Sequence, residues 1–160
     1  MRSKLFVPGS RPELFAKALA SEADAISFDL EDAVAEGRKA EARTLVADFL
    51  RSDAARNSSK QLLVRVNAPG TPHFEADVRA VAVAGLGLLN LPKCESAESV
   101  REAVNALAAA EAANGVVQPA RILATIESPR GLRFAAAIAA SDPRVAGLQV
   151  GYLDLFGPLG

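Results

Sequence analysis

Two carboxylates, Glu127 and Asp154, follow neighbouring strand-like stretches of the sequence. Glu127 ends the apolar, β-branched run 122–126, and Asp154 comes shortly after the run 147–152. Such runs are typical of buried strands, and ligands of parallel α/β folds bind at the carboxyl ends of strands. Because Mg²⁺ is usually held by one or two carboxylates, the pair predicts a divalent-cation site. The alternative for either residue taken alone is a cap on a helix or turn.

A second acidic group, formed by Asp29, Glu31 and Asp32, stands at another predicted strand end. In an extended strand Asp29 and Glu31 share one face and Asp32 lies on the other, so the three are not expected to reach one ligand. We expect Glu31 or Asp32 to orient metal-bound water or the nearby Arg65. The alternative is a solvated acidic turn before Gly37.

Arg65 stands inside the otherwise apolar run 62–66. Burying its charge without a partner is very costly, so the sequence predicts an anionic partner. The planar guanidinium suits a substrate carboxylate bound through two hydrogen bonds. The alternative is a structural ion pair with Asp29 or Glu31.

Three other reactive side chains lack partners at suggestive spacings. Lys93 follows a strand-like run and Pro92, but nothing indicates the lowered pKa of a Schiff-base lysine, so we interpret it as solvated. His73, the single histidine, lies in a polar loop and is expected at the surface. Cys94, the single cysteine, is interpreted as a small buried residue.

Six strand-like runs that alternate with five helical patterns must position these side chains. The strands are expected at 4–7, 25–30, 61–66, 86–91, 122–127 and 147–152, and the helices at 14–19, 39–50, 74–81, 97–113 and 132–138. Ser10 and Glu13 have capping-box spacing before the first helix, and 53–60 is expected to be a loop. Alternation of this kind predicts one domain with a parallel sheet, either open and doubly wound or closed as a (β/α) barrel.

The composition is that of an ordinary globular domain. Of the 160 residues, 50% are apolar and 23% charged, and 18 basic and 19 acidic residues give a formal net charge of −1. No long-range field therefore favours nucleic acid or an anionic membrane. Pro8 and Gly9 interrupt the first apolar run, so no signal peptide is expected, and we predict a soluble cytoplasmic protein.

Six short motifs in this order resemble the HpcH/HpaI aldolase superfamily, which includes the citrate lyase beta subunit and the malyl-CoA and citramalyl-CoA lyases. They are RSKLFVPGS at 2–10, DLEDAV at 29–34, VRVN at 64–67, LPK at 91–93, ATIES at 124–128 and GYLDLF at 151–156. The resemblance implies a (β/α)₈ TIM barrel and Mg²⁺-dependent carbon–carbon cleavage or formation. The implied substrates are citryl-CoA- or citramalyl/malyl-CoA-type thioesters, cleaved to a keto acid and an acyl thioester.

The resemblance also implies roles for particular side chains. By motif match Glu127 and Asp154 become the metal ligands, and Arg65 and Glu127 bind the substrate, with Arg65 as the clamp on its carboxylate or keto oxygens. The acidic motif with Asp29, Glu31 and Asp32 falls near the metal. Arg11 and Lys17 fall near positions where relatives hold the CoA nucleotide, and homo-oligomers such as trimers are implied.

The number of strands departs from this family pattern. A complete (β/α)₈ barrel typically needs ~250 residues, whereas the predicted pattern here has only six strands. An open edge on the sixth strand needs covering by a partner or a rearranged terminus. Two alternatives therefore remain: a truncated, non-catalytic metal- and anion-binding or assembly subunit, and a pyruvate-type aldolase that acts on free hydroxy acids.

Overall fold

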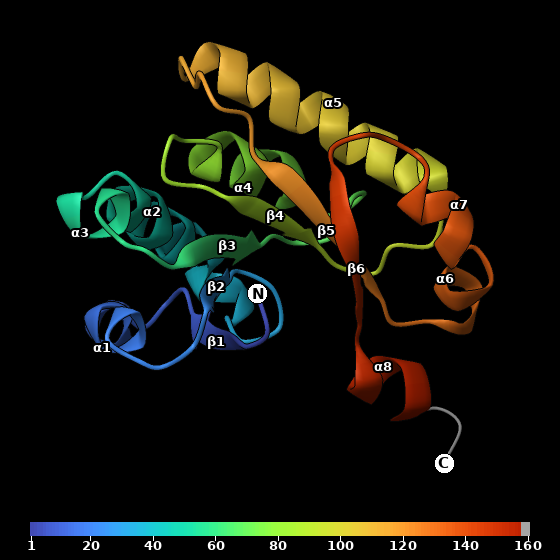
Figure 1. Ribbon diagram of the computed structural model, residues 1–160, viewed down its shortest axis with the longest axis horizontal. Coiled ribbons are helices and arrows are strands. Elements are labelled where there is room, and N and C mark those ends of the chain that lie inside the picture. The colour runs from blue at the N-terminus through green and yellow to red at the C-terminus, as the bar shows by residue number, and fades with distance from the viewer. Residues whose placement is uncertain (158–160) are drawn as a thin grey trace.

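The computed structural model describes residues 1–157, which form one parallel six-stranded sheet and its connecting helices (Figure 1). The strands are β1 (Lys4–Pro8), β2 (Ala25–Asp29), β3 (Gln61–Arg65), β4 (Leu88–Leu91), β5 (Arg121–Ile126) and β6 (Val145–Val150). The helices are η1 (Pro12–Leu14), α1 (Phe15–Leu19), η2 (Glu36–Arg38), α2 (Lys39–Leu50), α3 (Asp53–Arg56), α4 (Phe74–Val81), α5 (Ala97–Ala113), α6 (Pro129–Arg133), α7 (Ala135–Ala139) and α8 (Tyr152–Phe156).

The strand order in space is the order along the chain, from β1 to β6, and every neighbouring pair is parallel. In a doubly wound sheet the order of the strands would instead reverse at a switch point, with the strands still parallel. Right-handed crossovers between successive strands place the helices on one side, where α2 contacts α4 and α4 contacts α5 (Figure 1). The structure thus confirms the barrel-type arrangement and excludes the doubly wound one.

The two faces of the sheet differ in chemistry because successive side chains of a strand alternate between faces. One face packs against the helices and forms the main core, which includes Ile26, Phe28 and Val64. The inner face begins with a separate apolar cluster formed by Ala25, Leu63, Leu88 and Leu123. Two residues further along these strands the inner side chains become polar, as Ser27, Arg65, Asn90 and Thr125. The inner face is therefore apolar toward the amino ends of the strands and polar toward their carboxyl ends.

The edge strands β1 and β6 approach each other on the inner face. Lys4 Nζ on β1 donates a hydrogen bond to Gln149 Oε1 on β6 and lies 4.2 Å from the centroid of the Phe6 ring. No backbone pairing joins β1 to β6 among the described residues. The sheet is therefore curved enough for side chains of its two edge strands to contact each other.

Serine side chains begin several helices, as sequence rules suggest. Ser96 accepts a hydrogen bond from the Ser99 N–H at the start of α5, and Ser128 accepts one from the Gly131 N–H at the start of α6. Asn114 follows the last residue of α5, and Gly115 then adopts a φ of 67° that favours glycine. The predicted bounds of α2 and α5 agree with the observed ones.

Other expected boundaries were wrong. The capping box at Ser10 does not form, because Pro12 begins a 3₁₀ turn after Arg11, and Glu13 pairs with Arg11 instead. The expected loop 53–60 contains α3, capped by Ser52. The fifth expected helix is divided into α6 and α7 at Phe134, whose φ of −101° and ψ of 10° depart from helical values.

Membrane crossing can be assessed for the described helices. Within residues 1–157 no helix has both the length and the apolar character that spanning a bilayer requires.

The Lys4 ammonium makes the stability of the fold depend on pH. Burial, followed by the positive charge of Arg65, lowers the pKa of Lys4 from 10.5 to about 8. Between these two values the unfolded chain retains a proton that the folded chain has released, so folding becomes more favourable as the pH rises. We expect the free energy of unfolding of the wild type, measured in urea, to rise from pH 8 to 10.5 relative to that of Lys4→Met. Parallel curves would contradict the assignment.

Candidate functional site

A cavity of about 580 Å³ lies at the carboxyl ends of the strands. Its lining includes Asp29, Asp32, Arg65, Glu127, Tyr152 and Asp154. These residues come from β2 and the loop after it, from β3, from the end of β5 and from α8. The structure therefore brings together the two carboxylates of the predicted metal site, the predicted anion-binding arginine and part of the acidic motif.

Glu127 follows β5 directly and is only 6% exposed. Its Oε1 accepts a hydrogen bond of 2.5 Å from the Lys93 backbone N–H. Burial raises the pKa of Glu127; the Lys93 hydrogen bond opposes this rise, and the negative charge of Asp154 adds to it. A buried carboxylate beside a second carboxylate gains most from a cation that neutralises both.

Asp154 reaches the cavity from the first turn of α8. Helix α8, drawn in red, continues the chain beyond the end of β6 (Figure 1). Gly151 joins the two elements and packs directly against Glu127, because a Cβ there would lie 2.6 Å from Glu127 Oε2. The close approach of Gly151 keeps the start of α8 against the end of β5.

Arg65 is paired on all sides in this structure. Its Nε and Nη2 donate to the two oxygens of Asp29 at 2.8 and 2.5 Å. Its Nη1 lies 3.1 Å from Glu31 Oε2 and 3.2 Å from Asp32 Oδ2. Burial alone would lower the pKa of Arg65, but the Asp29 hydrogen bonds and the three carboxylate charges outweigh it and raise the pKa. The ion-pair alternative of the sequence interpretation is therefore present.

The acidic motif corrects one expectation. Asp32 was expected on the opposite face from Asp29 and Glu31, yet all three carboxylates contact Arg65. Strand alternation ends at Asp29, whose carboxylate accepts hydrogen bonds from the backbone N–H groups of Glu31 at 2.9 Å and Ala33 at 3.1 Å. In an extended strand these side chains would lie on opposite faces, whereas the turn directs all three toward Arg65.

Lys93 has a structural role that sequence reasoning missed. It is the single non-glycine residue with positive φ in residues 1–157, at 50°, a conformation costly for a side chain of this kind. This geometry directs its backbone N–H to Glu127, while its Nζ lies 2.9 Å from Glu31 Oε1. The hydrogen bond to Glu31 raises the pKa of Lys93. The side chain is half-exposed, in agreement with the interpretation as a solvated lysine, but its ion pair with Glu31 was not expected.

The remaining candidate residues lie away from the cavity. Cys94 is buried as expected, and burial raises its pKa to about 11. His73 Nε2 lies 2.6 Å from Glu36 Oε1, with its side chain 23% exposed. Arg11 pairs with Glu13, and Lys17 lines a separate apolar cavity between β1 and α1. The predicted CoA contacts of Arg11 and Lys17 remain predictions.

The donor set of the cavity can be compared with that of known metal sites. No group of three or more His, Cys, Asp or Glu side chains suited to a metal occurs in the part of the chain that the structure describes. Glu127 and Asp154 thus supply two hard oxygen donors in one cavity. This set fits Mg²⁺, which keeps several waters or substrate oxygens, and does not fit an all-protein cage.

Sequential parallel strands with a charged cavity at their carboxyl ends define a protein of the β/α-barrel class. Residues 2–160 match the family described as HpcH/HpaI aldolase/citrate lyase, and the chain belongs to this family. The motif resemblance is therefore confirmed.

Named relatives agree with this membership. The chain is 40% identical to the L-malyl-CoA/beta-methylmalyl-CoA lyase of Cereibacter sphaeroides, over 99% of this chain and 50% of that protein. It is 36% identical to the citrate lyase subunit beta of Leuconostoc mesenteroides subsp. cremoris, over 96% and 50% respectively. The chain spans about half the length of the curated relatives it matches.

Solved structures show the same fold. The citrate lyase beta subunit of M. tuberculosis, complexed with oxaloacetate and magnesium, is 38% identical and superposes with a TM-score of 0.74, over 98% of this chain and 60% of that one. RipC from Yersinia pestis is 28% identical with a TM-score of 0.73, over 100% and 62%.

The contact between Gly151 and Glu127 can be tested by adding one methyl group. Gly151→Ala places Cβ 2.6 Å from Glu127 Oε2 and 2.7 Å from its Cβ, so the site must shift. We expect a loss of about 1–3 kcal/mol in the free energy of unfolding, the usual cost of overpacking. Gly147→Ala on β6 is the matched control, since its nearest neighbour is 4.0 Å away. Equal losses in urea denaturation followed by circular dichroism would contradict the contact.

Proposed function

We propose that this chain belongs to an Mg²⁺-dependent carbon–carbon lyase that cleaves a citryl-CoA- or citramalyl/malyl-CoA-type thioester to a keto acid and an acyl thioester. The observation that carries the proposal is the convergence of Glu127, Asp154 and Arg65 on one cavity. Membership in the HpcH/HpaI family supports it, as do the names of the relatives.

In this proposal Glu127 and Asp154 hold the cation. The Lys93 N–H fixes one oxygen of Glu127, and Gly151 lies against the other, so the carboxylate has a defined orientation. When bound, Mg²⁺ supplies a Lewis acid for the keto oxygen that gains or loses charge as the carbon–carbon bond changes. The raised pKa of Glu127 reflects a negative charge that burial and Asp154 disfavour in the absence of a cation.

Arg65 orients the carboxylate of the keto acid in this proposal. Asp29 holds the plane of the guanidinium through two hydrogen bonds from Nε and Nη2. This leaves Nη1 as the nitrogen at which a substrate oxygen could replace a present partner. The Nη1 partner Asp32 has a side chain that is 55% exposed and can turn away to solvent. A substrate carboxylate replacing Asp32 would retain a charge-assisted hydrogen bond at Nη1.

The ligands of solved relatives support this choice. Structures of the M. tuberculosis protein CitE are described as complexes with magnesium and pyruvate, and with magnesium, acetoacetate and coenzyme A. We extend this ligand class to the present cavity, with CoA or an acyl carrier as the thioester group and Arg11 and Lys17 as weaker contacts. The proposal includes a cytoplasmic location and a homo-oligomer such as a trimer.

A second candidate is a metal- and anion-binding or assembly subunit without turnover. One observation favours it: β1 and β6 have no outer backbone partners among the described strands. Apolar side chains near this edge are correspondingly exposed, including Tyr152 and Leu153. In such a subunit the cavity would still bind Mg²⁺ and a keto acid.

Thioester cleavage distinguishes the two candidates. We expect the protein to release keto acid from citramalyl-CoA, malyl-CoA or citryl-CoA in the presence of Mg²⁺, measured by coupling to a dehydrogenase, and to lose this activity in EDTA. Binding of Mg²⁺ and pyruvate without turnover would favour the second candidate. Cleavage of free citramalate instead of its thioester would indicate a pyruvate-type aldolase.

The metal ligands can be tested without turnover. We expect Glu127→Gln and Asp154→Asn each to weaken Mg²⁺ binding at least tenfold, about 1.4 kcal/mol, because each removes one charged ligand from a two-carboxylate site. Asp48→Asn is the control, since its side chain is 73% exposed and belongs to α2, outside the cavity lining. Isothermal titration calorimetry measures all four proteins, and unchanged affinity in Glu127→Gln would refute the metal site.

A further inference from the structure

A second lysine, Lys39, is buried at the start of α2 and is not part of the cavity lining. It is 8% exposed, and its Nζ donates to the backbone oxygens of Leu30 at 3.0 Å and Glu31 at 2.8 Å, and to Asn67 Oδ1 at 2.8 Å. An ammonium group has three donors, so all of its hydrogen-bonding capacity is used. Lys39 has no part in the site derived above.

The partners of this ammonium are neutral, which is unusual for a buried charge. No carboxylate lies within 4 Å of Lys39 Nζ in residues 1–157. Asn67 is itself held by Asp77, whose Oδ2 accepts from the Asn67 side chain at 2.6 Å and backbone at 3.0 Å, and Asp77 pairs with Arg43 at 2.7 Å. Burying a charge among neutral oxygens is costly, so the three hydrogen bonds of Lys39 must offset a desolvation penalty that no ion pair relieves.

The two carbonyl groups that Lys39 binds belong to the turn of the acidic motif. Asp29, Glu31 and Asp32 reach Arg65 only because the chain leaves the strand at this turn. On one side the turn is held by the Asp29 carboxylate, which accepts from the backbone N–H groups of Glu31 and Ala33. On the other side it is held by Lys39 Nζ. Both sets of hydrogen bonds fix the same few peptide groups.

We propose that Lys39 is a positioning residue for Arg65. By holding the carbonyl groups of Leu30 and Glu31, it fixes the turn whose carboxylates orient the guanidinium, and it does so without touching Arg65 or the cavity. The effect on keto acid binding rests on the function proposed above, whereas the effect on the Arg65–Asp29 hydrogen bonds does not.

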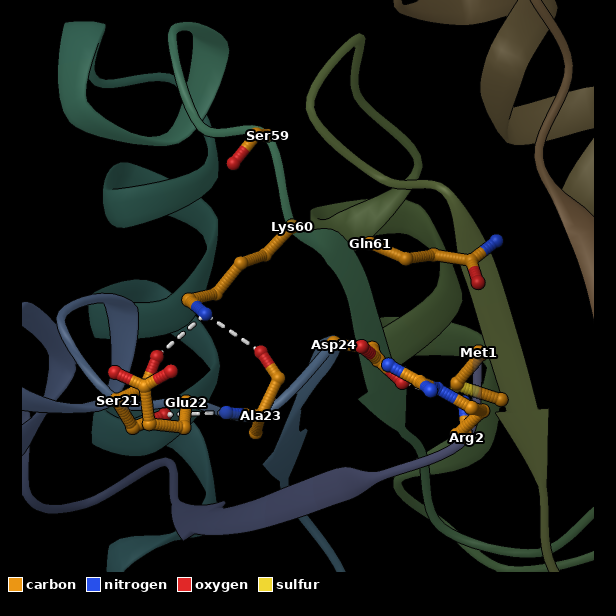
Figure 2. Close-up of a pocket in the computed structure, with 9 residues that line it drawn as sticks. All are labelled: Met1, Arg2, Ser21, Glu22, Ala23, Asp24, Ser59, Lys60 and Gln61. Atoms are coloured by element: carbon orange, nitrogen blue, oxygen red, sulfur yellow. Dashed lines mark hydrogen bonds between the residues drawn. The ribbon is translucent and has the colours of Figure 1, made fainter.

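Lys60 provides a matched control at the opposite end of the sheet. Its Nζ donates to the backbone oxygens of Ser21 at 2.6 Å and Ala23 at 2.5 Å. Figure 2 draws both hydrogen bonds as dashed lines. Like Lys39, it holds a turn next to β2 through carbonyl groups. The cavity beside it is lined by Met1, Arg2, the segment 21–24 before β2 and the segment 59–61 at the start of β3 (Figure 2). That end of a barrel serves stability, so Lys60→Met reports a lost lysine–carbonyl contact alone.

The Arg65 Nε–H proton gives a direct readout without ligand. It donates to Asp29 Oδ1 at 2.8 Å, so its exchange with solvent, measured by ¹⁵N NMR, reports how well the pair is held. We expect Lys39→Met to accelerate this exchange at least tenfold and Lys60→Met to change it less than twofold. In Lys39→Arg, which keeps a charged donor, we expect exchange within threefold of the wild type.

Ligand binding gives a second readout, with pyruvate as the probe at saturating Mg²⁺. We expect Lys39→Met to weaken pyruvate binding at least tenfold while Mg²⁺ affinity changes less than twofold, because Glu127 follows β5 and is held by the Lys93 backbone, and Asp154 lies on α8. A lysine that only stabilised the fold would leave both affinities of the folded protein unchanged. A wild type that binds none of pyruvate, oxaloacetate and glyoxylate would refute the proposed function but leave the exchange experiment decisive.

The proposal is overturned if Arg65 exchange in Lys39→Met matches the wild type, or if Lys60→Met accelerates it equally. Should Lys39→Met fail to fold, Lys39→Gln replaces it, since the amide retains one donor without the charge. An acceleration of at least threefold in Lys39→Gln supports the proposal, and wild-type exchange refutes it.

Discussion

The pairing of Arg65 with Asp29 is the interaction on which the arrangement of the site depends. The two residues are register partners at the ends of β3 and β2, so the parallel ladder itself places them side by side. Two hydrogen bonds between a guanidinium and a carboxylate fix a plane as well as a distance. Glu31 and Asp32 then approach the remaining edge of that plane. The backbone ladder thus determines where an anion can be bound.

The charge balance around this pair explains why a cation suits the cavity. Five carboxylates lie in or beside it, from Asp29, Glu31, Asp32, Glu127 and Asp154, and their positive neighbours there are Arg65 and Lys93. Burial is the first cause of the raised pKa values of Glu31 and Glu127, and the negative charges of Asp32 and Asp154, respectively, add to it. The divalent cation proposed between Glu127 and Asp154 would reduce the excess of negative charge, and a monoanionic keto acid would then add little to it.

Much of this arrangement follows from the sequence because its signals are local. Apolar periodicity gave the six strands and the bounds of α2 and α5, and the strand ends identified Glu127 and Asp154 as neighbours. The turn after Asp29 was missed because period-two alternation was continued past the end of the strand. The capping box failed because Pro12 favoured a different helix start.

Two lysines could not be assigned from sequence for a physical reason. Lys93 adopts a left-handed conformation that glycine or asparagine would signal, but lysine does not. Lys39 begins an amphipathic helix, where a lysine is ordinarily solvated, and only the folded chain shows its ammonium enclosed by carbonyl groups. In both cases the partners come from distant parts of the chain, so spacing along the sequence carries no information about them.

The junction at Gly151 has a consequence for how the outermost strand is retained. β6 has one hydrogen-bonded neighbour, β5, in the described sheet, and an edge strand of this kind frays more readily than a central one. Any ion shared by Glu127 and Asp154 would tie the two strands together just beyond their ladder. By thermodynamic linkage, binding of the ion would then stabilise the pairing of β6 with β5, and loss of that pairing would weaken binding of the ion.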